Sequence, residues 1–189
     1  MTRLAPVLSV LIATASAAQA IDIETATTSM LADVIRPLSA EPVLIDAVAS
    51  QNMTTADYDS ARIDALDRQW RAEVGSTQTP TIEPVVGNPA AEFLRGQVAA
   101  SGGTITEIFV MDGVGLNVAA SGVTSDYWQG DEAKFTETVG VGPDAVHVSD
   151  IEFDESTQNY SVQISIPLLD AAGDVIGAMT VGLDAEALM

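Results

Sequence analysis

The chain has 189 residues, of which 27 are acidic and 7 basic, so its formal net charge is −20; it contains no cysteine and one histidine. This excess of carboxylates argues against nucleic acid as a partner, because phosphates are held by Lys and Arg. The lack of cysteine excludes a disulfide scaffold, a thiolate nucleophile and cysteine-ligated zinc. Hydrophobic residues make up 47% of the chain, which argues against an acidic disordered protein and suits one folded domain.

The first twenty residues have the layout of a secretory signal peptide. A short positive segment precedes an apolar run from Leu4 to Ala15, and Ala18-Gln19-Ala20 has the small-x-small pattern of a cleavage site. A membrane anchor is the weaker alternative, because the apolar run is too short to span ~30 Å of hydrocarbon. We therefore expect cleavage after Ala20 and a periplasmic or secreted protein, with no membrane insertion after signal cleavage.

Residues 21–103 form an N-terminal helical segment in this prediction, because apolar residues recur there at helical spacing. One helix is expected around residues 30–38, and Pro42 suits the first turn of the next. Thr54 or Thr55 is expected to cap a third helix.

The third helix carries an apolar stripe and two acid–base pairs. Asp64 with Arg68, and Asp67 with Arg71, are four residues apart and are expected to pair on the face opposite the stripe. Gly75 is expected to end this helix. The stripe consists of Ile63, Leu66, Trp70 and Val74.

Residues 76–89 contain three prolines and are expected to form a loop, followed by a short helix over residues 90–101. After Gly103 the spacing of apolar residues changes to period two, and Asp112-Gly113-Val114-Gly115 is typical of a hairpin turn. Polar and apolar residues alternate without a break over 161–166, which predicts a strand with one buried face. Five strands are expected, over residues 104–111, 116–120, 146–153, 160–169 and 175–183, with a helical turn at 135–139.

Helices followed by strands with short connections indicate an α+β protein with an antiparallel sheet. The amphipathic N-terminal helices must bury their apolar stripes, and one face of the sheet offers the surface for this. We therefore expect residues 21–103 to pack on the sheet of residues 104–189 as one domain.

Residues with catalytic chemistry are sparse. His147 is the only histidine, and its position in a polar strand is more typical of a solvated or hydrogen-bonded side chain than of a general base. Gly113-Val114-Gly115 lacks a third glycine and opens no helix, so it is not a phosphate-binding loop. We expect no enzyme activity and no cofactor.

Calcium binding is an alternative, since oxygen donors are dense near residue 152 and hard cations take six to eight of them. No EF-hand spacing is present, so a solvated acidic strand end is the stronger interpretation and no metal ligands are assigned. The donors in question are Asp150, Glu152, Asp154 and Glu155, with Asp131 and Glu132 nearby.

The segment from Thr124 to Phe135 combines three aromatic residues, an amide, three carboxylates and the only lysine of the chain. Tyr and Trp provide rigid apolar faces with polar tips, which suit a small-ligand pocket, and an amine could stack on Trp128. The alternative is that Trp128 belongs to the core and that Lys134 only pairs with Glu132 or Asp131. Both interpretations remain open from the residues alone.

The run from Phe109 to Leu188 resembles the extracellular Cache sensor domains, PAS-like modules of bacterial chemoreceptors and histidine kinases. The order and spacing of five blocks carry the resemblance, and the last block is the most specific. These blocks are Phe109-Val110-Met111-Asp112-x-x-Gly115, Thr124-Ser125-Asp126-Tyr127-Trp128, Asp150-Ile151-x-Phe153-Asp154, Gln163-Ile164-Ser165-Ile166-Pro167-x-x-Asp170 and Gly173-x-x-Ile176-Gly177-x-x-Thr180-Val181-Gly182-x-Asp184.

The resemblance implies a five-stranded antiparallel sheet flanked by long N-terminal helices, with a small-molecule pocket on one sheet face. In amino-acid-binding relatives an Arg-x-Trp-Tyr run holds the ligand carboxylate and a later Asp holds the ammonium. Trp128 matches the Trp and Asp154 is a candidate for the Asp, but Asp126 replaces the Arg and Gln129 replaces the Tyr. A carboxylate does not hold a carboxylate at neutral pH, so the resemblance implies a cationic or neutral ligand.

We therefore predict a free-standing periplasmic sensor of the Cache type that binds a small organic ligand and signals through a membrane-bound receptor or kinase. A structural or interaction protein whose sheet face is filled by side chains, and a calcium-dependent module, are the alternatives. The predicted ligand-binding residues are Phe109, Asp126, Tyr127, Trp128, Gln129, Asp150, Phe153 and Asp154.

Overall fold

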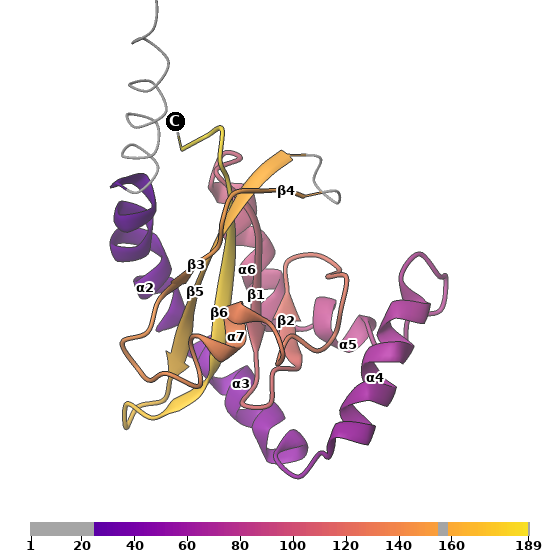
Figure 1. Ribbon diagram of the computed structural model, residues 1–189. Coiled ribbons are helices and arrows are strands. Elements are labelled where there is room, and N and C mark those ends of the chain that lie inside the picture. Colours follow the sequence, from indigo (N-terminus) through magenta and orange to yellow (C-terminus); the bar gives the residue numbers. More distant parts are fainter. Residues whose placement is uncertain (1–24, 155–158, 189) are drawn as a thin grey trace, which may run out of the picture.

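The computed structural model describes residues 25–154 and 159–188, with the side chains of Asp154 and Asn159 outside the description. The predicted signal peptide, residues 1–20, also lies outside the described residues. Figure 1 shows the helices that precede the sheet and the sheet itself. The helices are η1 (Leu31–Ile35), α2 (Arg36–Ser39), α3 (Pro42–Thr55), α4 (Ser60–Glu73), α5 (Glu83–Val86), α6 (Pro89–Ala100) and α7 (Ala133–Thr136).

The strands form one antiparallel sheet in the order β2-β1-β6-β5-β3, and β4 also pairs with β5. The predicted α+β class and antiparallel pairing are therefore confirmed. The strands are β1 (Ile105–Met111), β2 (Asn117–Ala120), β3 (His147–Val148), β4 (Glu152–Asp154), β5 (Asn159–Leu169) and β6 (Val175–Asp184).

One face of the sheet is apolar and packs against α3, α6 and the N-terminal helix, which is residues 25–39 and includes η1 and α2. The predicted alternation in β5 is confirmed, because Val162, Ile164, Ile166 and Leu168 are all buried on this face. They share the main core with residues of the helices and of β6, where Met179, Val181 and Leu183 alternate in the same way. The helix residues of this core include Ile35, Leu44, Val48, Ala91 and Leu94.

The opposite face presents the polar positions of the same strands together with a smaller apolar cluster. Phe109 and Met111 of β1 and Ala178 of β6 belong to that cluster, with Trp70 of α4 and Tyr127 packed beside them. Residues 121–146, which include α7, connect β2 to β3 along this face. The two faces therefore have different chemistry, and the second face is covered mainly by a connecting segment.

The boundary between α3 and α4 differs from the prediction. Thr55 ends α3 instead of capping α4, and its Oγ1 donates to the backbone of Gln51 and to Asp112. Asp59 is the cap, since its Oδ1 accepts a hydrogen bond from the backbone N–H of Arg62 at 2.8 Å. Thr55 does not cap α4 because it lies in the last turn of α3, five residues before α4 begins.

The predicted third strand, residues 146–153, is divided into β3 and β4. Val148 pairs with Ile164 and Glu152 pairs with Ser161, so the three residues between them lie opposite only two on β5. The extra residue produces a bulge, as is common at sheet edges. Ser149 holds the bulged segment to β5, because its backbone and its hydroxyl both bond to the backbone of Gln163 at 2.9 Å.

The predicted hairpin between β1 and β2 is confirmed, and Asp112 organises it. Its Oδ1 accepts hydrogen bonds from the backbone N–H groups of Val114 and Leu116, and its Oδ2 accepts from Gln51 and Thr55 of α3. The fully buried carboxylate is thus saturated with donors, as a buried charge requires. It joins the hairpin to α3.

Within residues 25–154 and 159–188, no helix combines the length and the apolar character needed to cross a membrane.

We expect Asp59→Ala to lower the free energy of unfolding by about 1 kcal/mol, because the substitution removes the side-chain cap of α4. Asp57→Ala, an exposed neighbour outside the cap, is the matched control and should change stability by less than half of that. Urea unfolding followed by circular dichroism measures both. Equal effects of the two substitutions would contradict the assigned cap.

Candidate ligand-binding pocket

The polar face of the sheet is arranged as a row of facing side chains on β5, β6 and β1. Ser165 and Thr180 are buried and exchange a hydrogen bond of 2.9 Å between their hydroxyls. Gln163 donates to Glu107 at 2.8 Å across Gly182, which pairs with both residues in the sheet. A side chain at position 182 would clash with Glu107, since an added Cβ would lie 2.7 Å from the Cγ of Glu107.

A pocket of about 500 Å³ opens on this face, between α7, the β3–β4 segment and β5. Its volume is within the roughly 300–1,000 Å³ that is usual for small-molecule sites. Polar residues dominate its wall, so it is suited to a polar ligand. The wall is formed by Glu132, Ala133, Lys134, His147, Ser149, Asp150, Glu152, Phe153, Ser161 and Gln163.

Lys134, the only lysine of the chain, lies at the centre of the face. Its Nζ is 3.0 Å from Oε2 of Glu132, 3.3 Å from Oε1 of Gln129 and 5.5 Å from the centre of the Phe109 ring. Its side chain is only 16% exposed. Lys134 therefore pairs with Glu132, one of the two partners that the alternative interpretation named, and the ring adds a cation–π contact.

His147 lines the pocket from β3. Its Nδ1 is 2.9 Å from Oε2 of Glu137, which agrees with the expectation of a hydrogen-bonded histidine. Glu137 is largely exposed, whereas the histidine side chain is mostly buried. The contact fixes the ring at the wall.

The charges of the wall are mainly negative. Glu132, Asp150 and Glu152 oppose Lys134, and Lys134 is already neutralised by its contact with Glu132. Asp150 and Glu152 are exposed at the mouth, so solvent weakens but does not cancel their field. The pocket is therefore more favourable for a cation than for an anion.

Among the aromatic residues of the predicted site, Tyr127 faces α4. Tyr127 stacks on Trp70 with ring centres 5.2 Å apart and planes 6° apart. Burial, followed by the charge of Asp112 and a contribution from Tyr58, raises the pKa of Tyr127 to about 12. Trp128 is half-buried, and its Nε1 donates to the carbonyl of Val114 at 2.8 Å.

Asp67 of α4 attaches this aromatic segment to the rest of the protein. Its Oδ1 accepts the backbone N–H groups of Tyr127 and Trp128 at 3.0 and 3.1 Å. Its Oδ2 pairs with Arg71 at 2.8 Å, and Arg71 also reaches Asp126 at 3.1 Å. The carboxylate of Asp67 thus neutralises a cation and satisfies two backbone donors.

The predicted pairs of α4 have different outcomes. The pair of Asp67 with Arg71 is confirmed, but Asp67 is buried and does not lie on a solvated face. No ion pair between Asp64 and Arg68 occurs in the part of the chain that the structure describes. The difference arises because the segment 126–128 packs over the Asp67 side of the helix and leaves Asp64 in solvent.

The structure brings some of the predicted ligand-binding residues together. Asp150 and Phe153 line the pocket, Phe109 lies beneath Lys134, and Gln129 accepts a hydrogen bond from Lys134. The side chain of Asp154 lies outside the described residues.

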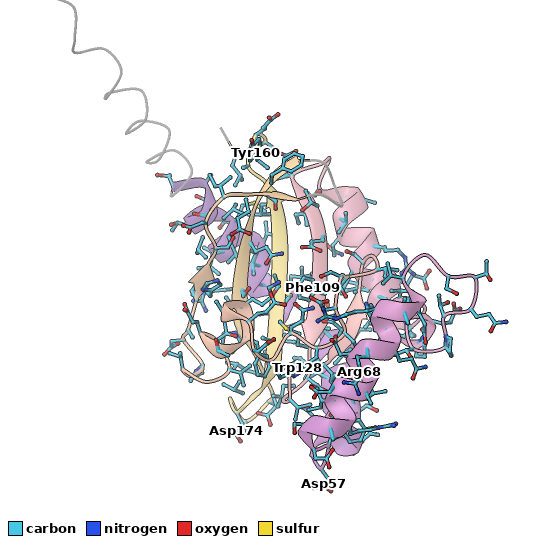
Figure 2. All side chains as sticks on the ribbon, turned by 45° about the vertical axis from the view of Figure 1, so that its right-hand side comes forward. Asp57, Arg68, Phe109, Trp128, Tyr160 and Asp174 are labelled. Atoms are coloured by element: carbon cyan, nitrogen blue, oxygen red, sulfur yellow. The ribbon has the colours of Figure 1, made fainter. Side chains whose placement is uncertain are left out.

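The others lie apart from this group. Asp126 pairs with Arg71, Tyr127 stacks on Trp70, and Trp128 bonds to Val114. Figure 2 shows Trp128 near α4 and Tyr160 at the opposite end of the sheet, with Phe109 between them. A role of these residues in ligand contact stays a prediction.

Several wall residues were not predicted. Ser161 and Gln163 occupy the polar positions of the alternation that predicted β5, so the same pattern could have indicated that they face the pocket. Ser149 became a wall residue through the bulge, which no sequence pattern indicated.

No group of three or more His, Cys, Asp or Glu side chains suited to a metal ion occurs among the described residues, which exclude Glu155 and the side chain of Asp154. The geometry therefore gives no support to the calcium alternative within this part of the chain.

Comparison with solved structures identifies the fold. The sensor domain of the histidine kinase DctB from V. cholerae aligns with 93% of this chain at a TM-score of 0.51 and 14% identity. The chain spans 57% of that domain. No family model and no curated protein sequence matches the chain.

Two chemoreceptor domains align less closely. The sensory domain of Campylobacter jejuni Tlp3 with isoleucine bound aligns with 87% of this chain at a TM-score of 0.41 and 14% identity. The chain spans 64% of that domain. The ligand-binding domain of Pseudomonas fluorescens CtaA in complex with L-serine aligns with 68% of this chain at a TM-score of 0.40 and 12% identity. The chain spans 52% of that domain.

The chain therefore has the fold of the Cache-type extracellular sensor domains, as its resemblance in sequence predicted. At this level of identity, the likeness to the DctB domain establishes the fold alone.

We expect Asp67→Ala to lower the free energy of unfolding by about 2 kcal/mol or more, because two backbone donors lose their acceptor. Asp64→Ala on the same helix is the matched control and should change stability by less than about 0.5 kcal/mol, as is usual for exposed positions. Chemical denaturation followed by tryptophan fluorescence measures both. Equal stabilities of the two variants would contradict the role of Asp67.

Proposed function

We propose that this protein is a sensor domain that binds a small organic cation, such as a primary amine, in the pocket on the polar face of the sheet. The observation that supports this proposal most strongly is the acidic wall, in which Asp150 and Glu152 have no basic partner among the described wall residues. The proposed role is recognition of a ligand and not catalysis.

The wall offers complementary groups to an ammonium ion. Carboxylates of Asp150 and Glu152 would accept charge-assisted hydrogen bonds, which are about twice as strong as those between neutral groups. Ser149 and Gln163 would bond to neutral polar groups of the ligand, and Phe153 offers an exposed ring face at the mouth. A neutral polar ligand would use the same hydroxyl and amide groups.

Two features disfavour a ligand carboxylate. Among the described residues, Lys134 is the only basic residue of the wall besides His147, and Glu132 and Gln129 already occupy its ammonium group. Asp126 stands where amino-acid-binding relatives carry Arg, and it pairs with Arg71. A ligand carboxylate would have to displace Glu132 from Lys134 and would lose part of its binding energy.

The fold supports a sensory role by analogy, because the neighbour with a TM-score of 0.51 is the sensor domain of a histidine kinase. We propose that the protein is exported through the signal peptide of residues 1–20, cleaved after Ala20, and acts in the periplasm or outside the cell. Its partner would be a membrane-bound receptor or kinase, to which it would present its ligand-dependent shape.

A structural or interaction role is the second candidate. Lys134 and Phe109 fill the centre of the polar face with their own contact, which leaves the pocket at one side of it. If the face is merely filled in this way, small metabolites will not stabilise the protein.

We expect 1,4-diaminobutane to raise the thermal unfolding temperature and to bind measurably in calorimetric titration, whereas succinate should do neither. Asp150→Asn and Glu152→Gln should each weaken diamine binding about tenfold, since a hydrogen bond to a charged group contributes about 1.5 kcal/mol or more. Asp174→Asn, an exposed carboxylate in the β5–β6 turn, is the matched control and should leave the affinity unchanged.

If Asp174→Asn weakened diamine binding as much as the two wall substitutions, only the overall charge would attract the diamine. That result would contradict the proposed pocket. Lack of stabilisation by the diamine and by a broad metabolite set would favour the structural role. Trp128→Phe tests the predicted aromatic contact separately: a tenfold loss of affinity would support it, and an unchanged affinity would reject it.

A further inference from the structure

An apolar groove of about 720 Å³ lies on the helix side of the sheet edge, opposite the polar pocket. It runs between the N-terminal helix, which contributes Leu31, and the β3–β4 segment, which contributes Val146, Val148 and Ile151. Figure 1 shows this helix beside β3 at the edge of the sheet.

The floor of the groove is continuous with the main core, but its rim is open. Val162 and Ile164 of β5 form the floor and are buried, at 2% and 0% exposure. The rim residues Val146, Val148 and Ile151 are exposed by 38%, 48% and 44%. Neighbouring exposed apolar side chains over a preformed groove are typical of an interaction surface.

The edge strand itself contributes to this exposure. β3 has only two residues, and Ile151 lies in the bulge between β3 and β4, outside the ladder with β5. A short and bulged edge does not extend the sheet well, so side-chain contacts in the groove are the more suitable means of binding.

The charge of the protein indicates the occupant. Asp150 is the only charged residue of the groove wall among the described residues, and the whole chain has a net charge of −20. A second copy of this chain would bring the same negative charge, which opposes self-association. A basic partner would be attracted by the same field.

We propose that this groove is a docking site for a cationic amphipathic segment of a partner protein. Apolar side chains of the partner would pack on Val148 and Ile151, and a Lys or Arg of the partner would lie beside Asp150. Two or more apolar side chains in a groove are the usual anchors of such segments.

The groove and the polar pocket share one wall. Ser149 and Asp150 line both cavities, and Ser149 is held to β5 through Gln163, which itself lines the polar pocket. If the proposed ligand-binding function holds, the docking surface therefore borders directly on the ligand. The docking inference itself needs no ligand and is tested on the free protein.

The probes are three short synthetic peptides, titrated into the full chain and followed by fluorescence anisotropy. One combines lysine and leucine in amphipathic helical order, the second replaces leucine by serine, and the third replaces lysine by glutamate. We expect the lysine–leucine peptide to bind at least tenfold more tightly than either of the other two.

The variant Val148→Asp/Ile151→Asp separates the groove from the overall charge. It makes the protein more negative, so an attraction by charge alone would strengthen, whereas docking in the groove should weaken at least tenfold. Val141→Asp, at an apolar position that is 70% exposed and outside the groove wall, is the matched control and should not weaken binding. Near-ultraviolet circular dichroism checks the fold, and Val148→Thr/Ile151→Thr provides a milder second variant that should weaken binding several-fold.

Unchanged or tighter binding of the lysine–leucine peptide by both double variants would overturn the proposal. Equal affinities of the protein for the lysine–leucine peptide and for the serine peptide would also overturn it. Concentration-dependent dimerisation that the same variants abolish would assign the groove to a second copy instead. None of these outcomes depends on diamine binding, so failure of the groove would leave the polar pocket untouched, and failure of the pocket would leave the groove untouched.

Discussion

The structure depends on a sheet whose two faces differ in chemistry. In β5 the residues Val162, Ile164 and Ile166 enter the main core, while Ser161, Gln163 and Ser165 face the other side. An amphipathic helix can bury the first face without loss of hydrogen bonds. The second face needs a cover with polar groups of its own, because buried polar groups require partners.

The connecting segment between β2 and β3 provides that cover, and the buried carboxylate of Asp67 holds the backbone of Tyr127 and Trp128 to α4. A second buried carboxylate, Asp112, fixes the preceding β1–β2 hairpin to α3. Beyond Trp128 the segment brings Lys134 over Phe109 on the polar face. The pocket lies where the cover stops short of the β3–β4 edge.

The alternation of β5, the hairpin turn and the pairing of Lys134 with Glu132 could be predicted because each is determined by residues close in the sequence. Other features depend on contacts between distant segments. The hydroxyl of Thr55 in α3 bonds to Asp112 of the hairpin, and Tyr127 lies on Trp70 of α4. No local pattern contains that information.

Some residues of the predicted site line the pocket, and others lie apart from it. The polar sheet face and its acidic wall follow from residues that the sequence made conspicuous, including Asp150 and Phe153. The bulge that brings Ser149 into the wall could not be predicted, since it reflects an unequal number of residues on two paired strands. The stacking and hydrogen bonds of Tyr127 and Trp128 are likewise products of tertiary packing.

The acidic pocket on the polar face is proposed to receive a small organic cation. Backbone amide chemical shifts of the labelled protein, recorded during titration with 1,4-diaminobutane, test this proposal residue by residue. Binding in the pocket should produce saturable shifts at Ser149, Asp150 and Gln163 and leave Val118 of the far edge strand unchanged. Saturable shifts confined to the segment around Trp128, or shifts that never saturate, would contradict it.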